Sequence, residues 1–151
     1  MQVTAESRTA LSRAKLFLKL ARDCPAEQRI EFEAFLEAAI VFARASLHRL
    51  KTEHENDPKW RDWWESLRGK ESIEFFRTER DWLLKEASPK IGQQVFAPRI
   101  GNPVVAIVPT LAADFYFFKD PKQSATDTLG RLLGELEIQL TEATACFGQS
   151  A

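Results

Sequence analysis

Arg80 is the residue of this sequence whose position most suggests chemistry. It lies in the stretch FFRTERDWLLKEASP, residues 75–89, in the middle of an apolar stripe at helical spacing. An arginine in such a stripe is paired with a carboxylate, lies at an interface, or acts on a substrate. Its aliphatic stem can pack while the guanidinium reaches the edge of the stripe. Periodicity alone favours the first of these, a salt bridge on a helix that contacts three neighbours.

The two histidines, His48 and His54, are the other candidates for chemistry. His48 continues the helical line of Val41 and Ala45, so we expect it to face the rest of the fold. A spacing of six puts the two imidazoles on different helix faces, and neither forms HExxH or another zinc pattern. The acidic turn EHEND is typical of solvated charge. We therefore predict no metal site and no cofactor, and the sequence has no P-loop, GxGxxG or GxSxG signature.

The composition is that of a soluble globular protein. The chain has 151 residues, 44% of them hydrophobic and 28% charged, which predicts one domain over 1–151 with a substantial core. Twenty-one basic residues against 22 acidic ones give a net charge of −1. This balance argues against bulk electrostatic binding to nucleic acid and leaves room for a local basic patch.

The cellular setting is predicted from cysteines and apolar segments. Cys24 and Cys146 form no CxxC pair, so we expect two free thiols. The first ten residues contain no apolar core of a signal peptide. The most apolar stretch, VVAIVPTLAADFYFF, is interrupted by Pro109 and Asp114 and is too short for a bilayer. These features predict a cytoplasmic protein without a membrane partner.

Hydrophobic periodicity predicts the elements that must position these residues. It indicates helices over about 5–22, 25–53, 72–87 and 124–147, and a short helix through three tryptophans that Gly69 ends. The second helix is apolar around almost its whole circumference, which predicts a central helix packed on several sides. Two short strands are expected over about 93–97 and 104–108, with DFYFF as a third strand or an extended segment. The predicted fold is all-α: a five-helix, up-and-down-type bundle with a small β-hairpin insertion at about 90–118, before the last helix.

The fourth predicted helix has two apolar faces. Ile73, Phe76 and Arg80 lie on one side, while Phe75 and Trp82 form a second apolar spot roughly opposite. A small bundle rarely needs both faces, so we predict a homodimer through this helix. The tryptophans of KWRDWWESL, beside Arg61 and Arg68, could stack nucleic-acid bases, but their amphipathic spacing favours packing against the bundle.

The order of helices and the sequence FFRTERDWLLKEAS resemble the HEPN superfamily, a family of helical bundles named for nucleotide binding in higher eukaryotes and prokaryotes. Its motif is an arginine, usually followed by a polar residue, with a histidine four to six positions after the arginine. Arg80 and Asp81 match the first half, and Lys85 stands where the histidine would be. The resemblance covers most of the chain loosely, with motif-grade agreement around Arg80.

This resemblance implies a dimer whose motif helices face a shared cleft and, in active members, metal-independent cleavage of RNA. In such a cleft an imidazole moves protons at the ribose hydroxyl, and an arginine stabilises the charge that develops on phosphate. Lys85 supplies charge, but an ammonium with a pKa near ~10.4 is a poor base at neutral pH. His48 could replace the missing imidazole if the second and fourth helices brought it beside Arg80.

Two functions follow as hypotheses. The first is a non-catalytic HEPN-like binding or assembly module that recognises a nucleotide, RNA or a protein partner. The alternative is a toxin-type, metal-independent ribonuclease that uses Arg80 with Lys85 or His48 at a dimer cleft. Position 85 distinguishes the two, and its lysine favours the binding module.

Overall fold

The computed structural model describes residues 5–25, 27–86, 91–93, 115–117 and 122–147, and the side chains of 80–86 and 91–93 lie outside this description. The described part is mostly helical and contains five helices, as predicted. They are α1 (Glu6–Arg22), α2 (Arg29–His54), α3 (Trp60–Ser66), α4 (Glu71–Glu86) and α5 (Ala125–Phe147). Two short strands, β1 (Ile91–Gln93) and β2 (Phe115–Phe117), stand between α4 and α5.

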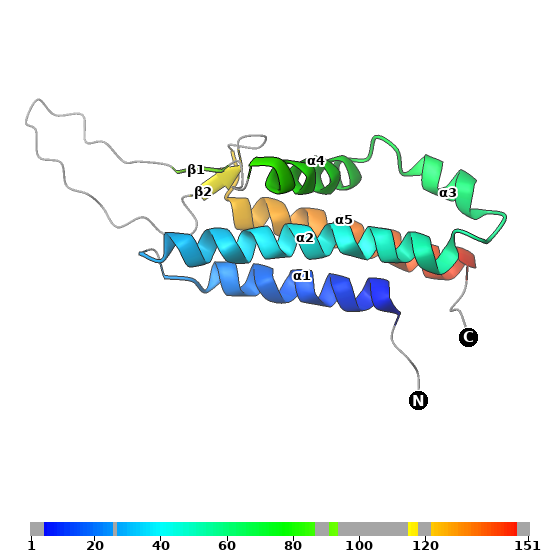
Figure 1. Ribbon diagram of the computed structural model, residues 1–151, viewed down its shortest axis with the longest axis horizontal. Helices are drawn as coiled ribbons and strands as arrows, with labels where there is room; N and C mark the ends of the chain where they lie inside the picture. The colour runs from blue at the N-terminus through cyan, green and yellow to red at the C-terminus, as the bar shows by residue number, and fades with distance from the viewer. Residues whose placement is uncertain (1–4, 26, 87–90, 94–114, 118–121, 148–151) are drawn as a thin grey trace, which may run out of the picture.

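Four long helices lie side by side, and the chain reverses direction from each to the next (Figure 1). α1 packs on α2 and α5, and α4 packs on the same two helices from another side. α3 lies beyond one end of α4, and the strands lie beyond the other (Figure 1). No helix in the described ranges is long and apolar enough to cross a membrane.

The core forms where the apolar stripes of these helices meet. On α1 the buried residues recur every three or four positions, and α5 contributes a row of leucines, which is the pattern of helices that bury one face. Large side chains with no more than 2% exposure fill the centre, and α2, α4 and α5 contribute them: Phe32, Leu36, Ile40, Leu47, Phe76, Leu129, Leu132, Leu133 and Leu136.

The predicted position of α2 is correct in part. It does contact three helices, α1, α4 and α5. However, its buried residues lie on one side only, and its outer side keeps Ile30 81% exposed and Val41 38% exposed. α2 is therefore packed on several sides, as predicted, but one side of it stays exposed although it is apolar. The bundle of this chain closes without covering that side.

The β insertion is present in the described part as one pair of strands. β1 and β2 are antiparallel, with Ile91 opposite Phe117 and Gln93 opposite Phe115. The segment DFYFF therefore contains a strand, which was one of the two alternatives predicted for it. The strands predicted over 93–97 and 104–108 fall outside the described residues except at position 93, where β1 ends.

Phe75 belongs to the core of its own chain. It is 6% exposed and makes edge-to-face contacts with Phe76 and with Phe117 of β2, at centroid distances of 5.4 and 5.1 Å. The prediction that Phe75 lies on a second face, free for a partner chain, is wrong. Helical spacing predicted correctly which side of α4 carries Phe75. It could not predict that β2, from a distant part of the sequence, packs on that side.

Candidate functional site

The three predicted motif residues, Arg80, Asp81 and Lys85, all lie on α4. Their side chains are outside the described part of the chain. Ile73 and Phe76, which share the predicted stripe with Arg80, are buried at 7% and 0% exposure. The first two residues of the predicted stripe are therefore buried, and the position of Arg80 in it stays a prediction.

Glu79, directly before Arg80, is a buried carboxylate that the sequence analysis did not single out. Its side chain is 1% exposed. Helical spacing could have predicted this burial, because Glu79 follows Phe76 by three residues and Ser72 by seven, and both of these are buried. A carboxyl group in that phase lies inside the bundle, next to the motif in the sequence.

His48 lies on α2 and is exposed, so the expectation that it faces the bundle is wrong. α2 and α4 run in opposite directions (Figure 1), and Arg44 of α2 lies beside Glu74 of α4 around one groove. Arg44 and Glu74 therefore mark one level along the bundle. His48 lies one helical turn after Arg44, toward the C-terminal end of α2. Position 80 lies more than one turn after Glu74, and because α4 is antiparallel to α2, this is the opposite direction along the bundle. The helix pairing therefore separates the two positions rather than bringing them together.

Ser7, Glu53 and His54 form the group that most resembles a catalytic triad. Both carboxylate oxygens of Glu53 accept hydrogen bonds from Ser7, one from its backbone N–H and one from its hydroxyl, each at 2.8 Å. The imidazole Nε2 of His54 lies 3.9 Å from Glu53 Oε2, and its ring stacks on Phe147 at 5.3 Å. In a catalytic triad the histidine lies between the nucleophile and the carboxylate. Here the carboxylate of Glu53 lies between Ser7 and His54 instead, so the order of the three groups is not that of a triad. The group fastens the start of α1 to the end of α2.

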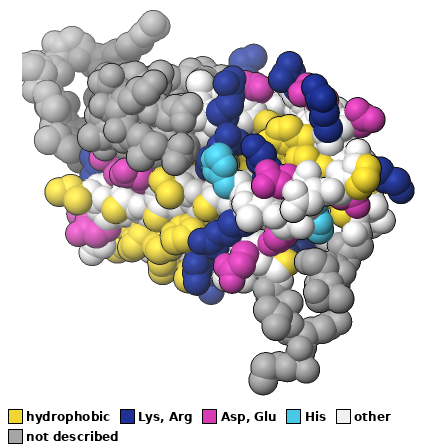
Figure 2. Space-filling view, turned by 45° about the vertical axis from the view of Figure 1, so that its right-hand side comes forward, with side chains coloured by type: hydrophobic (Ala, Val, Ile, Leu, Met, Phe, Trp, Pro, Cys, Tyr) yellow, Lys and Arg dark blue, Asp and Glu magenta, His cyan; other side chains and the backbone are white. Residues whose placement is uncertain are grey.

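The arginine groove is the stronger candidate for binding. It is a hollow of about 400 Å³ between α2, α3 and α4. α2 contributes Arg44, α3 contributes Trp64, the turn after α3 contributes Arg68, and α4 contributes Arg77. Figure 2 shows basic side chains at the upper right, in the region of α3 and α4, around a small hydrophobic patch. Leu67, Ile73, Glu65 and Glu74 complete the lining.

Arg68 and Arg77 each form an ion pair at the rim of the groove. Arg77 donates to Glu74 on the same helix, and Arg68 lies 3.4 Å from Glu65. The hydrogen bond from Arg77 lowers the pKa of Glu74, and the charge of Arg44 acts in the same direction. Three arginines against two carboxylates leave the lining with one positive charge in excess. Because the paired groups are largely exposed, these pairs are weak and exchange readily for another anion.

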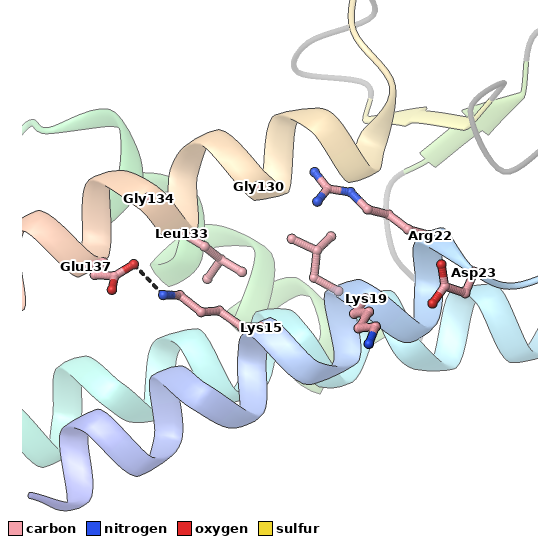
Figure 3. Close-up of a pocket in the computed structure, with 9 residues that line it drawn as sticks. Lys15, Lys19, Arg22, Asp23, Gly130, Leu133, Gly134 and Glu137 are labelled. Atoms are coloured by element: carbon pink, nitrogen blue, oxygen red, sulfur yellow. Dashed lines mark hydrogen bonds and ion pairs between the residues drawn. The ribbon is translucent and has the colours of Figure 1, made fainter.

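A second groove, between α1 and α5, has a structural explanation. It measures about 370 Å³, and its floor includes Gly130 and Gly134 (Figure 3). Lys15 pairs with Glu137 across it, and Arg22 donates to the carbonyl of Thr126 at 3.3 Å. A Cβ at Gly130 would come within 2.6 Å of the Arg22 guanidinium, so this glycine makes room for that arm. These cations tie α1 to α5.

The metal and thiol chemistry of the described part is limited. No group of three or more His, Cys, Asp or Glu side chains in that part could hold a metal ion. Cys24 is buried and Cys146 is exposed, and both are free thiols, as predicted. Burial raises the pKa of Cys24, and the charge of Glu31 adds to this shift. A thiol with a raised pKa is a weaker nucleophile, because less of it is thiolate at neutral pH.

Comparison with known proteins does not place this chain in a family. No protein-family model, no curated protein and no solved structure matches it. The resemblance to the HEPN superfamily therefore depends on the helix order and on the residues around Arg80.

Proposed function

We propose that this chain is a non-catalytic, HEPN-like binding module that holds single-stranded RNA in the arginine groove. The observation that carries the proposal is the convergence of three arginines and a tryptophan, from three helices and the turn after α3, on one hollow of about 400 Å³. This local basic patch stands in a chain whose net charge is only −1. Such a distribution suits recognition at one site rather than general attraction to polyanions.

The residue types of the groove match the two parts of a nucleotide. A guanidinium presents paired N–H donors to phosphate oxygens, so Arg44, Arg68 and Arg77 suit a backbone that passes between α2 and α4. An aromatic ring can stack a base, with a typical contribution of about 1–3 kcal/mol. Trp64 is half-buried, with its ring stacked on Trp60 at 5.1 Å, and this contact holds it at the groove.

The same residues supply little for cleavage. RNA hydrolysis without metal needs a group that exchanges a proton near neutral pH. The groove is lined by arginines, glutamates and apolar groups, and none of the described lining residues is a histidine. On α4 the family's histidine position is Lys85. Binding without turnover is therefore the function that these side chains support best.

The competing hypothesis is the metal-independent ribonuclease that uses Arg80 with Lys85 or His48 at a dimer cleft. It shares α4 with the proposed function but depends on different residues. Arg77 belongs to the groove, and Arg80 follows it by three positions on the same helix. Substitutions at these two positions therefore separate binding from cleavage.

The proposal is tested by fluorescence anisotropy with a fluorescein-labelled 12-nucleotide oligouridylate at low salt. We expect Arg77→Ala and Arg68→Ala each to raise the Kd about tenfold, because each removes one charged contact to phosphate. The slope of log Kd against log salt should also fall by about one for each arginine. Arg8→Ala is the matched control, since Arg8 is an arginine of α1 that contacts Thr141, away from the groove. Equal losses in Arg8→Ala and Arg77→Ala, or no loss in either, would refute the proposal.

A further inference from the structure

The outer side of α2 carries an apolar stripe that its own chain leaves accessible. Ile30, Ala34 and Val41 are exposed, and Ala38 and Ala45 are half-buried. These residues recur at spacings of three and four, so they share one side of the helix. Figure 2 shows hydrophobic side chains gathered at the lower left, in the region of α1 and α2. The stripe runs along most of the helix, whereas the exposed Ile138 of α5 is a single residue.

Charged residues along the stripe are divided between its two halves. Before Val41, the flanking residues include the acidic Glu31, Glu33 and Glu37. After Val41 they include Arg44 and Arg49, both half-buried, and the exposed Lys51. One half is thus mainly acidic and the other mainly basic. A second α2 that ran in the opposite direction would place unlike charges beside each other.

We infer that α2 forms an antiparallel contact with α2 of a second copy of this chain, with the two-fold axis close to Val41. Such an isologous contact requires a surface that is complementary to itself after a half-turn. The apolar stripe satisfies this condition because small residues lie on both sides of Val41. Ala38 and Ala45 let two helix backbones approach closely, near the lower end of the usual range of about 8–10 Å between helix axes.

The spacing along α2 shows which charges would meet. Glu37 precedes Val41 by four residues and Arg44 follows it by three, or about 6 Å and about 4.5 Å along the axis. A half-turn about Val41 therefore brings Glu37 of one copy to the level of Arg44 of the other. Both residues lie on the same side of the stripe, at about 40° and about 60° from Val41.

A second pair of opposite charges lies on the other side of the stripe. Glu31 and Arg49 precede and follow Val41 by ten and eight residues, and both project about 80° from it. The same half-turn brings them to similar levels. Arg49 also lies 3.5 Å from the Glu6 carboxylate of its own chain, so on this edge Glu31 of the second copy meets a cation that Glu6 shares. Pairs of unlike charge at defined levels are what fix register and orientation between paired helices. This contact differs from the one predicted through Phe75, which β2 covers within the chain.

The contact is tested by sedimentation equilibrium of the full chain, whose monomer has a mass of 17.2 kDa. We expect a reversible dimer, and Val41→Asp should weaken it at least about 100-fold, because two carboxylates would then face each other at the axis. Ile138→Asp, at an apolar residue that is 60% exposed on α5, is the matched control and should leave the dimer intact. Circular dichroism checks that both variants keep their helix content.

A charge exchange tests the register. Glu37→Lys and Arg44→Glu should each weaken the dimer alone, because each sets like charges opposite one another. An equimolar mixture of the two variants should form a mixed dimer. In that dimer the introduced lysine of one chain meets the introduced glutamate of the other, and the unchanged Arg44 meets the unchanged Glu37.

Three results would each overturn the inference. They are a wild-type monomer at high micromolar concentration, a dimer that survives Val41→Asp, and a charge-exchange mixture that stays monomeric. Arg44 also lines the arginine groove. However, no RNA enters this test, and the test of RNA binding replaces Arg68 and Arg77 instead, so failure of the dimer leaves the proposed function untouched.

Discussion

Two groups of polar side chains in this protein differ in their burial and in how firmly they are bound to partners within the chain. The group of Ser7, Glu53 and His54 contains the residue types of a hydrolase, but its members already contact one another. Ser7 is 2% exposed, and both oxygens of Glu53 accept hydrogen bonds from it. In the arginine groove, by contrast, Arg68 and Arg77 are exposed and pair with exposed carboxylates close by in the sequence.

This difference shows that residue type alone does not indicate function. A polar group that is buried and saturated contributes to stability, because removing one member leaves the others without partners away from water. A group whose ion pairs are exposed contributes little to stability and can exchange its partners for a ligand. Substitutions in the two groups should therefore affect different properties, the first the free energy of unfolding and the second the affinity for RNA.

The largest effect on stability is expected from Glu53→Ala. It removes the acceptor for both the backbone N–H and the hydroxyl of buried Ser7, and the cost should be about 1–3 kcal/mol. Urea denaturation of Glu53→Ala and of Glu55→Ala measures this difference, because Glu55 is exposed at the same end of α2. RNA binding should be unchanged in both. Loss of RNA binding in Glu53→Ala without loss of stability would reverse the roles of the two groups.

A smaller gain in stability is expected from Gly134→Ala. A Cβ at Gly134 meets nothing within 4 Å, so alanine should stabilise α5 by about 0.5–1 kcal/mol through helix propensity alone. Gly130→Ala is the matched variant and should gain less, because its Cβ would displace the guanidinium of Arg22. Thermal unfolding of the two variants compares them. Equal gains would show that Arg22 does not depend on Gly130.

The smallest effect concerns pH. Hydrogen bonds from Arg131 lower the pKa of Glu71 below 4.5, at N–O distances of 2.9 and 3.0 Å. A lowered pKa in the folded state stabilises the fold above the unfolded pKa, and this contribution is lost as the pH falls through the folded value. Because the pair is exposed, the contribution should be only about 0.5 kcal/mol. Unfolding curves from pH 7 to below 4.5 should lose less stability on acidification in Glu71→Gln than in wild type, and Glu142→Gln should behave as wild type.

Much of the helical framework could be predicted from the sequence because apolar periodicity is local. The predicted ranges 5–22, 72–87 and 124–147 agree within one residue with α1, α4 and α5. α2 begins at Arg29 rather than near Pro25. A turn from Pro25 to Gln28 comes first, and the Cys24 thiol lies 3.5 Å from the Gln28 carbonyl.

The candidate site could not be predicted, because its parts are far apart in the sequence. Arg44, Arg68 and Arg77 lie on or beside three different helices, and each resembles ordinary surface charge. Trp64 was considered for base stacking, but its amphipathic spacing favoured packing against the bundle. Phe75 shows the same limit, since its periodicity gave a direction on α4 while β2, much later in the sequence, decides what covers it. Local periodicity shows which residues share a face of a helix, and tertiary contacts determine which of these faces stay exposed.

The most direct test of the central claim, that the protein binds RNA without cleaving it, examines one labelled oligouridylate twice. Anisotropy measures binding, and a denaturing gel of the same sample after incubation without metal measures cleavage. We predict that wild-type protein binds and leaves the RNA intact, that Arg77→Ala loses most of the binding, and that Arg80→Ala acts mainly by lowering the melting temperature. Cleavage by wild-type protein that Arg80→Ala abolishes, with the melting temperature unchanged, would contradict the account and make Arg80 a catalytic residue.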